Sequence, residues 1–486
     1  MDRSTDASEI SLGGETLKGT TAKFVTVLVG FVGTILFARI LGPSAYGGFY
    51  LLLAVVEIVD RPIRGWAKAG KKRFSEANSD DRRIVGGVLL FTAGFLVVAI
   101  LGGFLAEPWL HSYTGLDHSP VLFAVLIAST TGYISVRSFV EARGLMGIAT
   151  WSNTLRNWLA FPLQLGLILG GLGVAGMAYG YATATVLAIP VVAYFAATAP
   201  TFPTRETVRS LWSYARYSIP VDFLGKAYSR FDLILLGMLL TPAAASYYDV
   251  AYRVTLPATF IAGVAAGGLM ARVSNLRSKD ETFGSDIENT LAFSGVLAFP
   301  IFFGALAIAD ELILTLFGGE YAPAGLLLIG IALYRVVKSQ TTPLMAVVDG
   351  LDRPDVNLRL SAITLGFNVV TGVLLVLWIG AIGVVISTVF AELLRYVFLV
   401  RFLKATHPTI ELFPRPIVEQ CAAGITMFAL VAAVGTAYPI RSWLGLLFVL
   451  GVGAATYALA LVVISSYHRT LATTALRGLP HPSLRS

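Results

Sequence analysis

Residues 37–56 read FARILGPSAYGGFYLLLAVV and join two apolar segments through a Gly-Pro turn. Proline at position 43 ends a helix, and the neighbouring glycines allow the chain to turn tightly. The apolar segments on either side, 23–41 and 46–62, are each about long enough to cross a bilayer as a helix. This stretch therefore predicts a helical hairpin that crosses a membrane twice.

The same reading applied along the chain predicts an all-α integral membrane protein with about fourteen transmembrane helices. The second predicted span is the weakest, because Glu57 and Asp60 interrupt it. The expected spans are 23–41, 46–62, 84–105, 120–140, 151–170, 174–196, 217–240, 246–270, 286–309, 323–345, 359–378, 382–402, 416–438 and 443–464.

The composition excludes the soluble classes of protein. Of the 486 residues, 56% are hydrophobic and 13% are charged, whereas a soluble domain carries about 25% charged residues. The single cysteine, Cys421, cannot form an internal disulfide, and no metal-ligand spacing or phosphate-binding glycine loop is present in the sequence. We therefore expect no cofactor, no metal and no nucleic-acid partner, and we interpret the net charge of +7 as the mark of cytoplasmic loops.

The distribution of lysine and arginine predicts the orientation in the membrane. Alternate segments (1–22, 61–83, 141–150, 197–216, 271–285, 346–358, 403–415 and 465–486) carry 23 Lys and Arg, and the seven segments between them carry one, Arg441. Basic residues stay in the cytoplasm, so we expect both termini there, in the cell (plasma) membrane. The connections are too short for an added catalytic domain.

Three pairs of connections indicate an internal repeat. The segment 41–49 returns as 240–248, at an offset of 199. Gly144-Leu145 returns as Gly350-Leu351 at an offset of 206, and Gly170, Gly173 and Val174 return as Gly380, Gly383 and Val384 at an offset of 210. The repeat predicts two six-helix lobes that insert the same way round, followed by two terminal helices.

The expected domains follow from this repeat. They are a cytoplasmic segment 1–22, an N-lobe 23–196, a cytoplasmic linker 197–216, a C-lobe 217–402, two further helices with their loop at 403–464, and a cytoplasmic tail 465–486.

At these residues the sequence resembles a known family. The stretches 37–56, 229–254 (SRFDLILLGMLLTPAAASYYDVAYRV), 350–360 (GLDRPDVNLRL) and 380–394 (GAIGVVISTVFAELL) are similar to patterns of polysaccharide flippases. These belong to the multidrug/oligosaccharidyl-lipid/polysaccharide exporter superfamily, and the resemblance covers about residues 15–405. It implies two lobes around a central cavity that alternates between the leaflets, and a lipid-linked glycan as cargo.

Charges within the predicted spans are the candidate site residues, since each costs at least ~3 kcal/mol near the centre of a bilayer. Arginine forks match phosphate oxygens and keep their charge, so we interpret these cations as a phosphate-binding cavity. The candidates are Arg230, Arg253, Lys226, Arg335 and Arg39. The alternative is that they are paired charges that hold helices together; on this alternative Asp222 pairs with Lys226, four residues along one face. Arg156 and Arg395 are expected at the membrane interface.

Acidic residues offer a second hypothesis. Asp232 and Asp249, or Glu57 and Asp60, could bind a coupling H⁺ or Na⁺. Structural pairing of Asp232 and Asp249 with Arg230 or Arg253 is the favoured interpretation.

The sequence thus predicts a monomeric transporter, not an enzyme, that moves a polyprenyl-(pyro)phosphate glycan from the inner to the outer leaflet for surface polysaccharide or glycoprotein synthesis. Anionic phospholipid headgroups near the basic run 64–73 and glycan-assembly proteins are the other expected partners. Three alternatives stay open. They are a drug or metabolite antiporter of the same superfamily, a membrane-embedded glycosyltransferase or polymerase, and a scaffold that does not transport.

Overall fold

The computed structural model describes residues 12–476 except 77–79, 438–439 and 441, and every regular element in that part of the chain is helical. Arg441 and parts of the expected segments 1–22 and 465–486 lie outside the described residues. Tertiary contacts divide the chain into two compact units, Met1–Gly237 with Thr241–Ser246, and Met238–Leu240 with Tyr247–Ser486.

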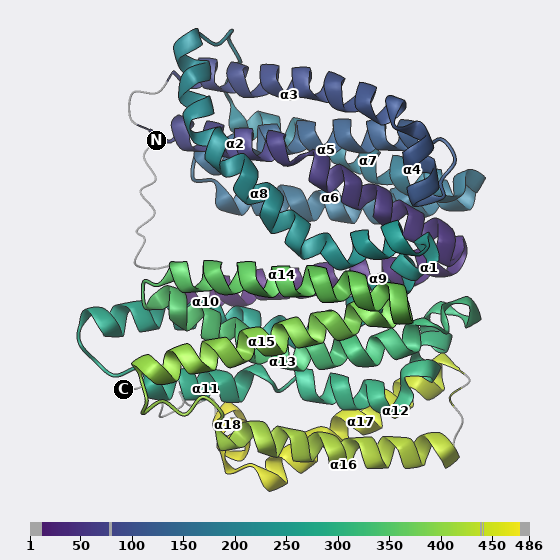
Figure 1. The fold of residues 1–486 in the computed structure, drawn as a ribbon, viewed down its shortest axis with the longest axis vertical. Coiled ribbons are helices and arrows are strands. Elements are labelled where there is room, and N and C mark those ends of the chain that lie inside the picture. Colours follow the sequence, from purple (N-terminus) through teal and green to yellow (C-terminus); the bar gives the residue numbers. More distant parts are fainter. Residues whose placement is uncertain (1–11, 77–79, 438–439, 441, 477–486) are drawn as a thin grey trace. The chain divides into compact units, whose positions relative to one another are not determined.

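The first unit is built from seven α-helices, a π-helical turn and the charged helix α8 (Figure 1). Helix α5 packs on α2, α3 and α7, and α6 packs along α7. The elements are α1 (Leu12–Val59), α2 (Arg61–Phe74), α3 (Asp81–Leu105), α4 (Glu107–Thr114), α5 (Ser119–Ala142), α6 (Met146–Leu167), the π-helix η1 (Ile168–Leu172), α7 (Gly173–Ala196) and α8 (Arg205–Leu239).

The second unit begins within α9. Helix α15 packs on α13 and α14, α10 packs on α13, and α16 packs on α12 and α17. The elements are α9 (Pro242–Val254), η2 (Leu256–Thr259), α10 (Phe260–Ser278), α11 (Gly284–Ser294), α12 (Ala298–Phe317), η3 (Gly319–Tyr321), α13 (Ala324–Gly350), α14 (Pro354–Ile379), α15 (Ala381–Thr406), α16 (Arg415–Ala437), α17 (Trp443–Ile464) and α18 (Ser466–Leu476).

Ten helical stretches among the described residues are long and apolar enough to cross a membrane. Two of them lie in helical stretches long enough for two crossings, α1 with 48 residues and Met146–Ala196 with 51, and these are broken inside, at Gly42 (φ 74°, ψ 168°) and at Gly171 (φ 91°, ψ 3°). The charged helices α8 and α13 are not among the ten. The membrane character expected from composition is confirmed, and the count of fourteen spans stays a prediction.

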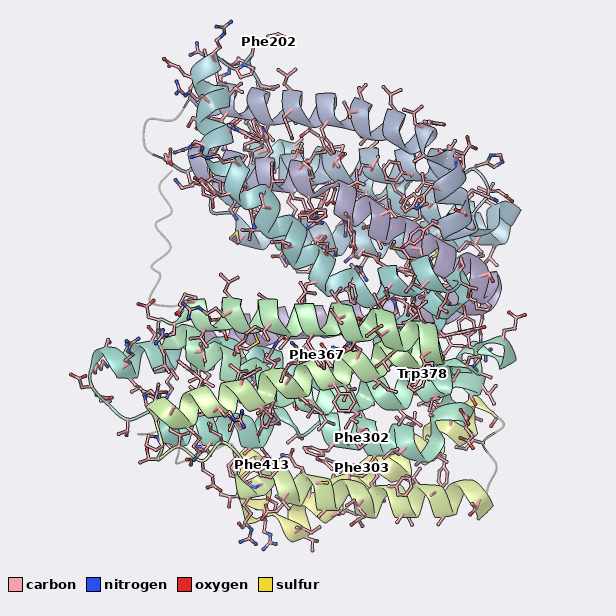
Figure 2. The ribbon with its side chains drawn as sticks, viewed as in Figure 1. Phe202, Phe302, Phe303, Phe367, Trp378 and Phe413 are labelled. Atoms are coloured by element: carbon pink, nitrogen blue, oxygen red, sulfur yellow. The ribbon has the colours of Figure 1, made fainter. Side chains whose placement is uncertain are left out.

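The outer surface agrees with a lipid environment. Trp378, in the last turn of α14, is 85% exposed, and Phe202, in the connection before α8, is 87% exposed (Figure 2). Aromatic side chains near span ends are typical of the membrane interface.

The amphipathic helix α2 closes the core of the first unit. Its apolar face buries Trp66, which stacks on Phe91 with ring centroids 4.3 Å apart and donates a hydrogen bond to the Gly87 carbonyl at 3.3 Å. The opposite face carries the basic residues of the run 64–73. Apolar residues at helical spacing on one face explain why this charged segment is a helix beside the core.

Backbone geometry refines the repeat. In the turn after α5, Gly144 has φ 77°, and the Leu145 N–H donates to the Val140 carbonyl at 3.2 Å. In the turn after α13, Asp352 has φ 56°, and the Arg353 N–H donates to the Val348 carbonyl at 3.1 Å. Both are helix ends closed by a left-handed residue. The matching offset is 208, so the offset of 206 expected from Gly-Leu pairs is two residues out of register.

A second turn gives an offset of 207. Gly173 (φ 51°), the first residue of α7, corresponds to Gly380 (φ 67°), the residue just before α15. Three residues later, a Cβ would lie 2.8 Å from the backbone of the preceding helix on Gly176 and 2.4 Å on Gly383. The pairing of Gly170 with Gly380 is therefore wrong by three residues. The change from 208 to 207 arises because the π-turn Ile168–Leu172 inserts one residue that the second copy lacks.

Candidate functional site

Helix α8 carries a charged face. Asp222, Lys226 and Arg230 follow one another at four-residue spacing, which places them on one side of the helix. Their partners come from α1 and α2, which belong to the same unit. The site in the first unit is therefore a seam between α8 and the α1–α2 segment.

The carboxylate of Glu57 forms ion pairs with two cations of this face. Lys226 Nζ lies 2.9 Å and Arg230 Nε lies 2.8 Å from the same oxygen, Glu57 Oε2. About a fifth to a quarter of each side chain is exposed, at 20% for Lys226, 27% for Arg230 and 21% for Glu57. One negative charge faces two positive charges, so the triad keeps a net charge of +1.

The next turn repeats this arrangement. Asp60 is 1% exposed and pairs with Arg61 at 2.7 Å and with Arg64 at 2.8 Å. Again two cations share one carboxylate. Buried charges need such partners, because desolvation of an isolated ion is costly.

The partner expected for Asp222 is wrong. Asp222 pairs with Lys68 of α2 at 2.6 Å, and Lys226 pairs with Glu57 instead. The spacing of four permits an Asp222–Lys226 pair, but α2 places another ammonium beside Asp222. Over the whole seam, three carboxylates (Glu57, Asp60 and Asp222) meet five cations (Arg61, Arg64, Lys68, Lys226 and Arg230), which leaves a net charge of +2.

The other basic residues of α2 also pair with acids of the first unit. Lys71 pairs with Glu141 at 2.8 Å, and Lys72 and Arg73 pair with Glu76 at 3.0 and 2.9 Å. The Lys72 hydrogen bond, followed by Arg73, holds the pKa of the Glu76 carboxyl below its usual value. These exposed pairs contribute little to stability.

In the second unit, Asp249 and Arg253 form an ion pair along α9, with 2.5 Å between Oδ2 and Nε. The favoured structural pairing of Asp249 is confirmed. Asp249 is 5% exposed and Arg253 is 26% exposed, so this acid is already occupied by a fixed cation.

Arg335 lies inside the second unit with 5% of its surface exposed. Its guanidinium carbon lies 4.1 Å from the centre of the Tyr252 ring, and Nε donates to the Thr255 hydroxyl at 3.3 Å. No carboxylate of the described residues lies within ion-pair distance of Arg335. Cation–π attraction and two neutral acceptors hold this charge.

A buried network lies next to Arg335 on α13 and α15. Glu392 is 3% exposed and pairs with Lys338 at 3.4 Å and with Arg395 at 3.3 Å. Thr341 donates to Glu392, and Arg395 Nη2 donates to the Thr364 hydroxyl at 2.8 Å. The interfacial position expected for Arg395 is wrong, because helix packing covers all but 3% of this side chain.

The structure brings together some predicted site residues and separates others. Lys226 and Arg230 meet on Glu57, whereas Arg253 and Arg335 lie in the second unit, on α9 and α13. Arg39 has an exposed side chain on α1, and Asp232 is half-buried on α8. Prediction missed Glu57 as the counter-ion of Arg230; the signal was a carboxylate that interrupts an otherwise apolar span.

These clusters are suited to holding an oxyanion. Guanidinium groups stay charged at any physiological pH and donate parallel hydrogen bonds to phosphate or carboxylate oxygens. No group of three or more metal-ligating side chains occurs in the part of the chain that the structure describes.

Ten apolar helical stretches, with cations buried beside them, define a multi-pass membrane protein. The chain belongs to the family of polysaccharide biosynthesis proteins, whose model matches residues 36–325. This confirms the resemblance seen in the hairpin motifs.

Two relatives come from Haloferax volcanii. "Probable flippase AglR" is 28% identical over 92% of this chain and 95% of its own length. "Probable low-salt glycan biosynthesis flippase Agl15" is 27% identical over 74% of this chain and 76% of its own length.

Solved structures share the fold. The lipid II flippase MurJ in an inward closed conformation has a TM-score of 0.77 at 12% identity, over 93% of this chain and 99% of that one. A multidrug resistance MATE family transporter of the MOP superfamily, inward-facing, has a TM-score of 0.60 at 17% identity, over 79% of this chain and 96% of that one. At these identities the likeness concerns the fold alone.

Proposed function

We propose that this protein moves a lipid-linked glycan, carried on a polyprenyl phosphate or pyrophosphate, from the inner to the outer leaflet by alternating access. The observation that carries the proposal is the shared carboxylate of Glu57. Lys226 and Arg230 both contact that one carboxylate oxygen, in a membrane protein of a polysaccharide biosynthesis family. A phosphate offers further oxygens to the same two cations.

The cations of the proposed phosphate path are Arg230, Lys226, Arg253, Arg335 and Arg39. Lys226 and Arg230 in the first unit and Arg253 in the second keep about a fifth to a quarter of their side chains exposed, which favours an anionic cargo. Two flippases among the relatives, one of them named for glycan biosynthesis, support the class of substrate.

The finer topology belongs to the same proposal. We take the chain to have fourteen spans, in two six-helix lobes plus two terminal helices. Both termini lie in the cytoplasm of the cell that makes the glycan, and the protein functions as a monomer. Transport requires no bond to form or break. Exposed basic residues of α2 would contact anionic headgroups, and glycan-assembly proteins would supply the cargo and receive it.

An antiporter of the same superfamily is the main rival, since MATE transporters share the fold. Such a transporter needs an acid that is free to bind its coupling ion. Asp249 is held by Arg253, and Glu57 and Asp60 each hold two cations, so we assign these acids to charge balance. Asp232→Asn tests the ion-coupling hypothesis for this residue, which lies half-buried on α8.

The test is reconstitution of the purified chain in liposomes with a fluorescent polyprenyl-pyrophosphate glycan in both leaflets. We expect the glycan of the inner leaflet to become accessible to an external glycosidase only in liposomes that contain the protein. A cell that lacks the protein should accumulate lipid-linked glycan on the cytoplasmic side. Liposomes that instead exchange cationic drugs against protons, and leave the glycan in place, would favour the antiporter.

A further inference from the structure

A second guanidinium site lies in the first unit, where α5, α6 and α7 pack together. Arg156 stands ten residues from the first residue of α6 and eleven from the last, so it lies in the middle of this helix. Its guanidinium carbon lies 5.3 Å from the ring centre of Tyr133 on α5 and 5.3 Å from that of Tyr181 on α7. The interfacial position expected from the sequence does not fit a side chain held between two rings at mid-helix.

The charge of Arg156 has no counter-ion on the protein. No carboxylate of the described residues lies within ion-pair distance, and its one hydrogen bond runs from Nη2 to Asn157 Oδ1 at 3.1 Å. The Nε donor is buried and has no acceptor. Because an arginine cannot lose its proton, the charge persists and is stabilised only by the rings and one neutral amide.

The internal repeat provides a comparison for this site. At the offset of 208, Arg156 and Tyr133 of the first unit correspond to Thr364 and Thr341 of the second. At the offset of 207, which applies after the π-turn, Thr185 corresponds to Glu392. In the second unit, Glu392 forms ion pairs with Lys338 and Arg395, two cations of this three-helix core. In the first unit, the Thr185 hydroxyl donates a hydrogen bond to the Tyr181 carbonyl of its own helix, at 2.7 Å.

The two copies therefore differ in whether a carboxylate stands at this position. The second unit has a carboxylate at this position, Glu392, which accepts a hydrogen bond from Thr341, and Arg395 donates to Thr364. The first unit has a guanidinium at the same level and no acid. Arg156 is half-buried, so part of this residue stays accessible.

We propose that Arg156, fixed between Tyr133 and Tyr181, binds an oxyanion of the transported molecule, either a phosphate or the carboxylate of an acidic sugar. Both have the paired oxygens that fit a guanidinium fork. The rings pre-position the fork, and Asn157 orients one of its nitrogens. This inference rests on the proposed function and adds a binding group to it that is separate from the α8 seam.

The experiment measures binding of two probes, a polyprenyl phosphate and free glucuronate, to the full-length protein in lipid nanodiscs by isothermal titration calorimetry. Arg156→Gln should weaken binding of one probe at least about tenfold, and the probe affected identifies the source of the oxyanion. Arg156→Lys keeps the charge, loses the fork and should weaken binding less. Arg216→Gln is the matched control, because Arg216 also stacks on a tyrosine, with its guanidinium carbon 4.7 Å from the Tyr217 ring centre, but is exposed on α8.

Glycan translocation by the wild-type protein is measured alongside. If the wild type translocates glycan and Arg156→Gln binds both probes as tightly as the wild type, the Arg156 site is refuted and the proposed function stands. A wild type that translocates glycan but binds neither probe refutes the site as well. A wild type that translocates nothing refutes the proposed function and, with it, this inference. If Arg156→Gln does not fold, unchanged binding by the folded Arg156→Lys variant decides against the site.

Discussion

Arg230 of α8 donates through Nε to Glu57 of α1, over 2.8 Å, and Lys226 reaches the same carboxylate oxygen from one turn earlier. The contact joins α1 and α8 through two residues that lie 173 positions apart in the sequence. Two cations of one helix face thus meet at a single carboxylate oxygen, at the place where we propose the phosphate path.

A double-mutant cycle tests the Glu57–Arg230 contact. Glu57→Gln and Arg230→Gln should show a coupling free energy of about 1 kcal/mol in thermal unfolding, modest because each side chain is about a quarter exposed. The Arg353–Asp355 pair is the matched control. It lies on the surface, and its cycle should show no measurable coupling. Additive effects at Glu57 and Arg230 would contradict the contact.

Export should depend on the cations of the proposed phosphate path. Arg230→Ala and Arg253→Ala are expected to abolish surface glycan without lowering the amount of protein in the membrane, because the anionic cargo loses a fixed partner. Surface glycan is measured by lectin staining and membrane protein by immunoblot. Normal surface glycan in both variants would exclude these two residues from the phosphate path.

Glu392 should matter to stability. Glu392→Gln removes the carboxylate that pairs with half-buried Lys338 and with buried Arg395, and removal of one partner of a buried ion pair costs about 3–5 kcal/mol. We expect a clear fall in the unfolding temperature in detergent. Glu311→Gln, at an exposed glutamate of α12, is the control and should leave that temperature unchanged. An unchanged temperature in Glu392→Gln would mean that the network carries no net charge interaction.

His468 predicts a pH dependence of stability. It is 7% exposed at the start of α18, with Nδ1 2.9 Å from the Ser465 hydroxyl and Nε2 3.2 Å from Gln420 Nε2. Because Gln420 Nε2 also donates to the Ala292 carbonyl, it faces His468 as a donor, which requires a neutral imidazole. Burial lowers the pKa of His468 below 6.5, against a smaller opposite effect of Glu419.

A group whose pKa is lower in the folded state stabilises the fold above its unfolded pKa. That contribution is lost as the pH falls below about 6.5. The unfolding temperature of the wild type should therefore fall between about pH 7.5 and about pH 5.5 by more than that of His468→Gln. Equal falls in the two proteins would show that His468 does not titrate in this window.

Gly176 should not accept a side chain. A Cβ there would lie 2.8 Å from the Leu167 carbonyl carbon, so Gly176→Ala must separate α6 from α7 at a cost of about 1–3 kcal/mol. Gly166→Ala on α6 meets nothing within 4 Å and should be neutral or slightly stabilising. The two unfolding temperatures are compared in the same detergent, and equal values would place the helices further apart than described.

Much of the fold follows from composition and periodicity. Apolar runs of about twenty residues must become helices in a bilayer, because every backbone polar group needs a partner within its own segment. Glycine and proline at positions such as Gly42 and Pro43 mark the breaks between spans. For the same reason the four-residue spacing of Asp222, Lys226 and Arg230 was enough to place them on one helix face.

Repeat register and charge partners could not be read in the same way. The π-turn at Ile168–Leu172 adds one residue without changing the sequence pattern around it, so only backbone angles revealed the offsets of 208 and 207. Matching Gly-Leu pairs gave a nearby but wrong alignment, since both residues are common in membrane helices.

The sequence by itself determined that the chain is a helical membrane protein and which charges of its predicted spans need an explanation. Tertiary structure alone decided that Asp222 pairs with Lys68, that Glu57 serves two cations, and that Arg156 has two rings but no acid. The reason is that helix formation depends on neighbours within four residues, whereas the choice of ion partner depends on which other helix lies within about 4 Å.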